Sequence, residues 1–287
     1  MIKFGPAGNS LSFYAEGHKH TEEMPEWLRG RGLDCFEYSL GRGITVKEET
    51  AAVIGEKARL FGIEMSVHAP YYVNFASADS YEKSERYILE SLKILRVFGG
   101  SRLVFHPGSP LKQTREKAFG VLKDAMKKLA ETVKSRSEFA GLTLCPETMG
   151  KAGQMGSVPE ILEICKIDAV YTPCIDFGHV NARERGSLKT EDDYGAVLDA
   201  YLDALYERAL NMHVHFSRIQ YAENGEIRHL TFDDREYGPY FETLAPVLAE
   251  KGMRPYIICE SDGTQAEDAA EMKRIYENTL KNRIKSQ

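Results

Sequence analysis

Six short apolar runs in this chain of 287 residues end in, or lead directly into, a histidine or a carboxylate. Imidazole nitrogens and carboxylate oxygens are side-chain ligands that zinc and manganese accept in proteins. These residues can form one site only if the fold brings the ends of the runs together. The runs are SVHAPYYVN with His68, LVFHPGS with His106, LTLCPET with Glu147, YTPCIDFGH with Asp176 and His179, MHVHFS with His213 and His215, and YIICES with Glu260.

The composition is that of a soluble globular protein, with 43% hydrophobic and 28% charged residues. The formal net charge of −6 argues mildly against a nucleic-acid binder, although a local basic patch or a metal site could still engage phosphate. No apolar run reaches about 18 residues and no signal-peptide pattern is present, so we expect a cytoplasmic protein outside membranes. The five cysteines form no CxxC pair and are expected to be reduced core thiols: Cys35, Cys145, Cys165, Cys174 and Cys259.

Short runs rich in β-formers alternate with longer amphipathic segments along the chain. Apolar residues at i, i+3 and i+4, followed by glycine, predict helices. Helices are predicted at 47–62, 80–100, 114–136 and 266–284. Strands are predicted to begin at Ile2, Leu33, Ile63, Ser101, Leu142, Val170, Asn211 and Pro255.

Eight strands that alternate with helices predict an α/β protein with a parallel sheet, and a single-domain (β/α)₈ TIM barrel over residues 1–287 fits this length. A doubly wound sheet is the alternative. It is disfavoured because the first unit, FGPAGNS, lacks the GxGxxG dinucleotide fingerprint. One irregular insertion, SRIQYAENGEIRHLTF, follows the seventh strand, and its NG turn predicts a small hairpin.

The barrel would bring the polar strand ends together, because its active site lies where the carboxyl ends of the strands converge. A lone histidine at a strand end is more often a hydrogen-bonded core residue, but the whole set on one face predicts a metal centre. There are more ligands than one tetrahedral ion needs, so two or three ions are expected. Glu147 could bridge two of them about 3.5–4 Å apart. Of His213 and His215, which share one face of their strand, we prefer His215 because it lies nearer the strand end.

The motifs HAPYYVN, FHPGS, PETMGKAGQMG, CIDFGHVNARERG, HVHFS and CES occur in this order through most of the chain. Together they resemble the endonuclease IV family of apurinic/apyrimidinic endonucleases, within the xylose-isomerase-like barrels. The resemblance implies a zinc phosphodiesterase that incises DNA 5′ to abasic sites. It also implies three zinc sites: His68, His106 and Glu147 at the first, Glu147, Asp176, His215 and Glu260 at the second, and His179 with His229 of the hairpin at the third.

The chain departs from the family pattern beside His229. The family has an aspartate two residues before this histidine, where the present chain has Ile227. Glu226 is adjacent, but in a regular strand it would point to the opposite side. The third zinc site is therefore expected to lack its carboxylate.

The resemblance also implies residues that contact DNA. Tyr71 occupies the position of a family tyrosine that helps to open the duplex, and Arg42 is the approximate equivalent of a family arginine. Basic residues of the strand-end loops, namely Lys151, Arg183 and Arg185, are expected to contact phosphates.

A second resemblance leads to a different activity. The sugar isomerases and epimerases related to tagatose epimerase and xylose isomerase share the late ligands Glu147, Asp176, His215 and Glu260, which in that pattern hold a single Mn²⁺ or Mg²⁺. Glu147 and Glu260 are the expected catalytic residues, and in these enzymes they serve as acid and base. His68 and His106 favour the nuclease, whereas Ile227 and the acidic charge favour the sugar enzyme. A metal-binding protein without catalysis is a third reading. In each case we expect a monomer.

Overall fold

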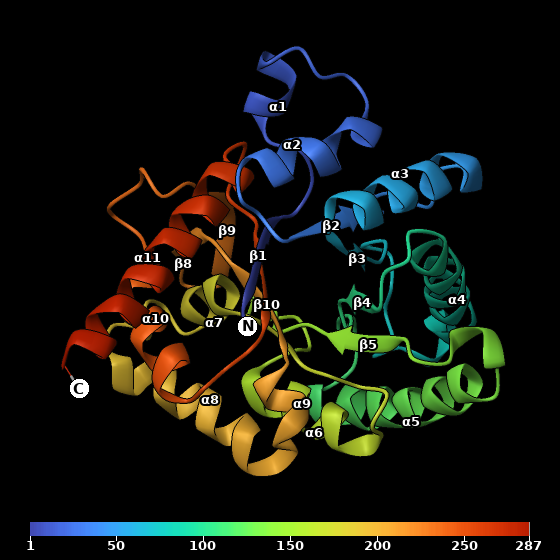
Figure 1. The fold of residues 1–287 in the computed structure, drawn as a ribbon. Helices are drawn as coiled ribbons and strands as arrows, with labels where there is room; N and C mark the ends of the chain where they lie inside the picture. Colours follow the sequence, from blue (N-terminus) through green and yellow to red (C-terminus); the bar gives the residue numbers. More distant parts are fainter. Residues whose placement is uncertain (287) are drawn as a thin grey trace.

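The computed structural model describes residues 1–286, and its centre is a closed barrel of eight parallel strands (Figure 1). Four strands pair in the order β1-β10-β7-β6 and four in the order β2-β3-β4-β5. Parallel bridges from Ala7 to Glu37 and from Glu147 to Cys174 join the two sheets and close the barrel. The predicted (β/α)₈ barrel is thus confirmed. The strands are β1 (Lys3–Pro6), β2 (Cys35–Ser39), β3 (Glu64–His68), β4 (Arg102–Phe105), β5 (Thr143–Pro146), β6 (Cys174–Asp176), β7 (His213–Phe216) and β10 (Tyr256–Cys259).

Helices surround the barrel on the outside, and all four helices expected from the sequence are present (Figure 1). The α-helices are α1 (Leu11–Ala15), α2 (Met24–Gly30), α3 (Glu48–Phe61), α4 (Tyr81–Val97), α5 (Arg115–Lys134), α6 (Val158–Ile167), α7 (Phe177–Arg183), α8 (Glu191–Leu205), α9 (Glu207–Leu210), α10 (Phe241–Glu250) and α11 (Gln265–Ser286). Short 3₁₀ turns occur at Thr21–Glu23, Ala78–Ser80 and Ser137–Phe139.

The sequence signals that predicted the helix ends act as expected. Helix α3 ends at Gly62, whose φ of 68° is a left-handed conformation that glycine adopts without strain. Helix α5 begins after Thr114, whose hydroxyl accepts a hydrogen bond from the backbone N–H of Lys117 at 3.4 Å. Leu122, Met126 and Leu129 lie on the buried face of this helix at helical spacing. Such helices cover the barrel and leave its strand ends to form the site.

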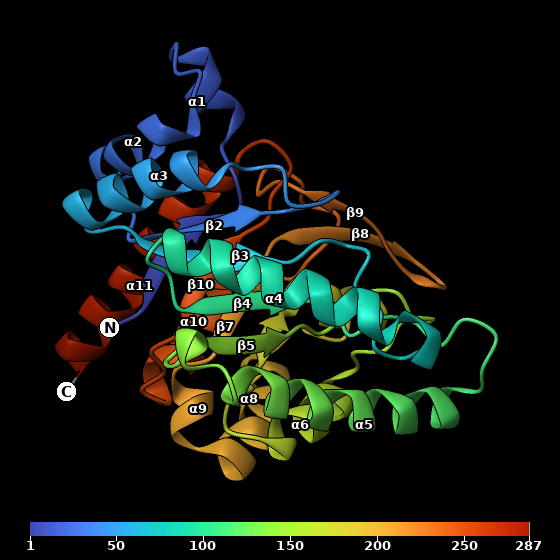
Figure 2. The same cartoon turned by 90° about the vertical axis from the view of Figure 1, so that its right-hand side faces the viewer.

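The predicted hairpin follows β7 directly and consists of β8 (Arg218–Ala222) and β9 (Gly225–Leu230). Figure 2 shows it extending on the side to which the barrel strands point. Its pairing is not regular, because Gln220 pairs with Arg228 whereas Tyr221 pairs with Glu226. One residue of β9, Ile227, is therefore left without a partner as a β-bulge.

The five cysteines are free and buried, as expected from the sequence. Within residues 1–286, none of the helices has the length and apolar character needed to cross a membrane.

Candidate metal centre

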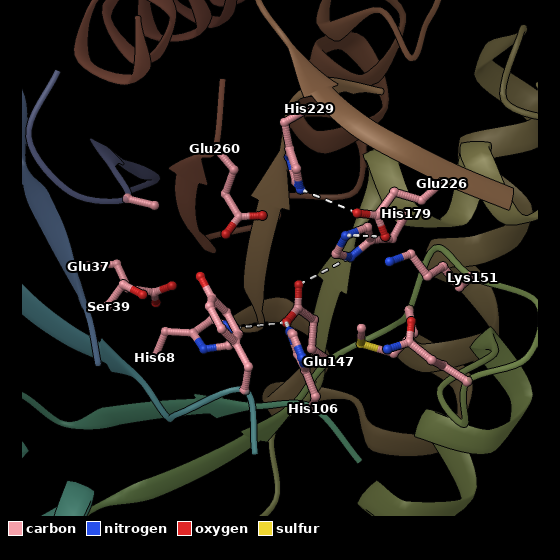
Figure 3. Close-up of a pocket in the computed structure, with 14 residues that line it drawn as sticks. Glu37, Ser39, His68, His106, Glu147, Lys151, His179, Glu226, His229 and Glu260 are labelled. Carbon is pink, nitrogen blue, oxygen red and sulfur yellow. Dashed lines mark hydrogen bonds and ion pairs between the residues drawn. The ribbon is translucent and has the colours of Figure 1, made fainter. Parts of the chain in front are cut away.

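The six strand-end side chains predicted from the sequence meet at the carboxyl ends of the barrel strands (Figure 3). They belong to two groups in which the potential ligand atoms all lie within 4.8 Å of one another. Glu147 is common to both groups, as expected for a bridging carboxylate. The groups are His68 with His106 and Glu147, and Glu147 with Asp176, His215 and Glu260.

Glu147 is the buried centre of this arrangement. Its Oε2 lies 3.1 Å from Nε2 of His68 and 3.1 Å from Nε2 of His106. Its Oε1 lies 3.0 Å from Nδ1 of His215 and 3.3 Å from Nδ1 of His179. Burial alone would raise the pKa of Glu147, but the neighbouring histidines outweigh burial and hold this pKa well below its usual range. The carboxylate is therefore an anion that directs both oxygens at imidazoles.

Asp176 and His179 are held together by the junction of β6 and α7. Asp176 is the N-cap of α7, and its Oδ1 accepts a hydrogen bond from the backbone N–H of His179 at 2.8 Å. Its other oxygen, Oδ2, is buried without a hydrogen-bond partner and lies 3.0 Å from Nδ1 of His179. Burial raises the pKa of Asp176 to about 6, with the negative charge of Glu260 adding to the effect and His179 opposing it. An unpartnered buried carboxylate oxygen is what a missing cation would leave.

The hairpin contributes a third group, and its carboxylate is that of Glu226. Nε2 of His179 lies 3.5 Å from Oε2 of Glu226, and Nε2 of His229 lies 3.9 Å from Oε1 of the same residue. The expectation that Glu226 would point away was wrong, because the bulge at Ile227 shifts the alternation of side chains by one residue. Glu226 and His229 therefore face the site together, while the side chain of Ile227 is 53% exposed.

The loop after β5 holds the hairpin in place. The carbonyl of Gly150 accepts a hydrogen bond from the backbone N–H of Glu226 at 3.2 Å, and Lys151 forms a β-bridge with Gly225. A Cβ atom at position 150 would lie 2.7 Å from Cβ of Glu226 and 2.9 Å from Cδ2 of His179. The approach of loop and hairpin thus requires glycine at this position.

Arg183 supports the same loop. Its guanidinium donates hydrogen bonds to the carbonyl oxygens of Met149 at 3.2 Å, Lys151 at 2.9 Å, Ala152 at 3.1 Å and Gln154 at 3.2 Å. The prediction that Arg183 contacts phosphate is therefore wrong, because both of its terminal nitrogens donate hydrogen bonds to carbonyl oxygens of the protein. Arg185 is exposed and lies outside the residues that line the cavity.

Two histidines of the site, His68 and His229, are oriented by the ring nitrogen that does not face a carboxylate of the site. Such a contact fixes the ring and leaves the other nitrogen available as a ligand. Nδ1 of His68 contacts the Ala69 carbonyl at 2.9 Å, and Nδ1 of His229 contacts the Ser217 hydroxyl at 2.8 Å. Nδ1 of His179 contacts the Thr148 carbonyl at 3.0 Å but also lies 3.0 Å from Oδ2 of Asp176 and 3.3 Å from Oε1 of Glu147.

These three groups fit divalent metal ions. Their donors are imidazoles and carboxylates, and neighbouring donor atoms are separated by distances such as the 3.1 Å between His68 and Glu147. Separations near 3 Å arise when donors bind one cation at about 2.0–2.2 Å each. The buried Oδ2 of Asp176 would then gain the partner that it lacks in the protein.

The cavity above the clusters has a volume of about 350 Å³. Tyr71 lines it with a side chain that is 58% exposed, and its ring lies 5.9 Å from that of His106 at an interplanar angle of 23°. Lys151 also lines the cavity and is exposed, and Figure 3 shows its ammonium group directed toward the clusters. Arg42 is exposed but is not among the residues that line the cavity.

His213 and Glu37 lie deeper in the barrel. Nε2 of His213 is 3.0 Å from Oε2 of Glu37 and does not approach Glu147, which agrees with the preference for His215 at the strand ends. Glu37 was missed by the sequence analysis because it lies in the middle of β2. A signal was available, since a carboxylate inside the strand CFEYS is unusual in a buried barrel strand.

Comparison with known proteins places this chain in a family. The model of the xylose isomerase-like TIM barrel family matches residues 25–278, and the chain belongs to this family. An uncharacterized protein of Methanocaldococcus jannaschii is 31% identical over 91% of this chain and 92% of its own length.

Relatives with more specific names match less of the chain. A probable endonuclease 4 of Mycoplasma mobile is 28% identical over 40% of each chain. Among solved structures, endonuclease IV from Thermus thermophilus has a TM-score of 0.65 at 20% identity, over 98% of this chain and 99% of its own. A D-tagatose 3-epimerase-like protein has a TM-score of 0.69 at 19% identity, over 97% of both chains. Both structural similarities show the fold and leave the reaction open.

Proposed function

We propose that this protein is a zinc-dependent phosphodiesterase that cleaves DNA 5′ to abasic sites, in the manner of endonuclease IV. The observation that carries the proposal is the third group, His179 with Glu226 and His229, beside the two strand-end groups. A sugar isomerase needs only one ion held by the late ligands. A hairpin that brings two further ligands over the centre has no role in that chemistry.

The cavity supplies groups that suit a phosphodiester. When bound, the metal ions would activate water for attack on phosphorus and neutralise the charge that develops on the phosphoryl and leaving oxygens. Glu147 would hold two of the ions at a fixed separation, while Lys151 would contact a non-bridging or neighbouring phosphate oxygen. Tyr71, exposed at the rim, would pack against a base or sugar beside an extruded abasic nucleotide, which is easily flipped because it lacks a stacking base.

The alternative is a divalent-metal-dependent sugar isomerase or epimerase of the tagatose 3-epimerase kind. The compact group of Glu147, Asp176, His215 and Glu260 supports it, because these four residues alone could hold one Mn²⁺ or Mg²⁺. The net charge of −6 also suits a small neutral sugar better than DNA.

Glu226→Gln separates the two proposals, because Glu226 belongs to the third group alone. Metal content, incision of a duplex with one abasic site and epimerisation of ketose sugars would be measured for the wild type and the variant. The phosphodiesterase predicts two or three zinc ions in the wild type, one fewer in Glu226→Gln, and a loss of incision of roughly 10²-fold or more.

Glu223→Gln is the matched control, because Glu223 is an exposed carboxylate in the turn of the same hairpin. It should keep the wild-type metal content and rate. Epimerisation that Glu226→Gln leaves intact, together with a single manganese or magnesium ion per wild-type chain, would overturn the nuclease proposal in favour of the sugar enzyme.

A further inference from the structure

A buried carboxylate lies below the metal centre, on the β2 side of the barrel. Glu37 is fully buried in the middle of β2, and Figure 3 shows it on the side of the cavity opposite Lys151. A buried charge is costly unless other groups compensate it. Its position therefore calls for a reason beyond packing.

Glu37 contacts two histidines and one hydroxyl. Its Oε1 lies 3.0 Å from Nε2 of His215, and its Oε2 lies 3.0 Å from Nε2 of His213. The hydroxyl of Ser66 donates a hydrogen bond to Oε2 at 2.9 Å. Burial alone would raise the pKa of Glu37, but His215 and His213 outweigh it and hold this pKa well below the usual range. Glu37 thus places a carboxylate against the inner nitrogen of a candidate ligand.

His215 differs from His68 and His229 in the partner of its second ring nitrogen. It directs Nδ1 at the candidate metal centre, where Glu147 Oε1 lies at 3.0 Å and Glu260 Oε2 at 3.5 Å. Its remaining nitrogen therefore faces the barrel interior. There its neighbour is the carboxylate of Glu37, which belongs to none of the candidate ligand groups, whereas His68 and His229 have neutral oxygens beside their second nitrogens.

We propose that Glu37 is a positioning residue that orients His215 and increases its strength as a metal ligand, with Ser66 and His213 holding Glu37 in place. The proposal rests on the metal centre proposed above and is independent of the substrate. A carboxylate beside the second N–H of a ligating histidine fixes the ring and makes the imidazole more basic. His215 would thereby donate more strongly than an imidazole whose second nitrogen contacts only a neutral oxygen, as in His68.

A second arrangement of the same residues has to be distinguished. The contacts of Glu37 with the two histidines lack the alignment of hydrogen bonds, so Nε2 of His215 and both ring nitrogens of His213 are buried without a hydrogen-bond partner. Potential ligand atoms of Cys174, His213 and His215 lie within 4.8 Å of one another. An inner metal ion held by these three residues would be the competing explanation.

The test compares cobalt-substituted wild type with Glu37→Gln, which keeps the shape of the side chain and removes its charge. Cobalt affinity would be measured by titration, and the visible absorption bands would report on the ligand field at the ion. We expect Glu37→Gln to bind the full complement of metal, with affinity at the ion held by His215 reduced roughly 10–100-fold and its absorption bands shifted. Ser66→Ala keeps the carboxylate beside His215 and removes one hydrogen bond to it, so its affinity should fall by clearly less than that of Glu37→Gln.

Two results would overturn the proposal. One is an unchanged affinity and spectrum in Glu37→Gln. The other is that Glu37→Gln and Cys174→Ser both lose the same ion completely. This result would identify an inner metal site. If Glu37→Gln does not fold, Glu37→Asp serves the same purpose, because it keeps the charge and withdraws it from His215. These readouts involve metal alone, so a protein that incises no DNA could still pass them.

Discussion

The candidate metal centre has two halves that are built differently. The strand-end half consists of His68, His106, Glu147, Asp176, His215 and Glu260, which all belong to barrel strands or follow them directly. The hairpin half consists of Glu226 and His229 on β9, and it meets the strand-end half through His179 at the start of α7.

The two halves differ in what fixes them. Neighbouring parallel strands position the first half, and each of its strands is paired on both sides. The second half depends on one bulge, on the glycine contact at Gly150 and on the carbonyls that Arg183 holds. The strand-end half is therefore expected to be the rigid part of the site, and the hairpin half the part that a single substitution can displace.

Glu147→Gln should have the largest effect, because Glu147 connects all of the strand-end ligands. Without the negative charge, the buried His68, His179 and His215 and the half-buried His106 lose their shared anion, and two candidate metal sites lose a ligand. We expect the loss of at least two ions per chain and a fall in activity of at least about 10³-fold, since several kcal/mol of charge stabilisation would be lost. Metal analysis and single-turnover kinetics would measure both.

Glu163→Gln, at an exposed carboxylate of α6, provides the control for Glu147→Gln and should change neither quantity. Wild-type metal content in Glu147→Gln would show that Glu147 does not bridge the ions. Glu147 would then not be the residue that connects the ligands of the strand-end half.

Gly150→Ala should affect the hairpin half alone. The added methyl group would overlap Cβ of Glu226 and the ring of His179, so the hairpin has to move away from the strand ends. We expect the loss of one ion, a fall in activity of roughly 10²-fold and little change in the strand-end ions. Gly153→Ala in the same loop has open space around the new methyl group and should behave as the wild type. Equal losses in both variants would mean that the loop acts through general flexibility rather than through the contact at Gly150.

The same difference explains what the sequence could predict. The alternation of strands and helices predicted the fold, and the polar residues at the strand ends predicted the six strand-end side chains of the site. Both predictions were possible because the carboxyl ends of parallel barrel strands lie on one face of the barrel whatever the register. Glu226 was placed on the wrong side because alternation assumes a regular strand, whereas β9 has a bulge at Ile227, next to the residue that contacts the loop at Gly150. Glu37 was overlooked because the sequence analysis considered only residues at strand ends, and Glu37 lies in the middle of β2.

The third prediction concerns pH and the strand-end half. Burial disfavours protonation of His68, but its contact with Glu147 outweighs burial and raises the pKa of His68 to about 8. Burial opposes protonation of His179 as well, but Asp176 and Glu147 outweigh burial and raise its pKa. For His215, Cys174 together with nearby carboxylates outweighs burial and raises the pKa. A metal ion binds neutral imidazole, so below pH 8 it must displace protons from the metal-free site.

Metal affinity should therefore fall as the pH falls from 8 to 6, by about tenfold per pH unit for each proton displaced. Asp176, with a pKa raised to about 6, adds a further proton below that pH. Glu147 adds none, because its pKa is lowered and it is already ionised. Calorimetric titration at pH 7 in two buffers of different ionisation enthalpy would count the protons released, and His68→Gln should release fewer. An affinity that stays constant between pH 6 and 8 would mean that the histidines are neutral before metal binds. The strand-end half would then be a preformed neutral site, and the charges assigned to its carboxylates would have to be compensated elsewhere.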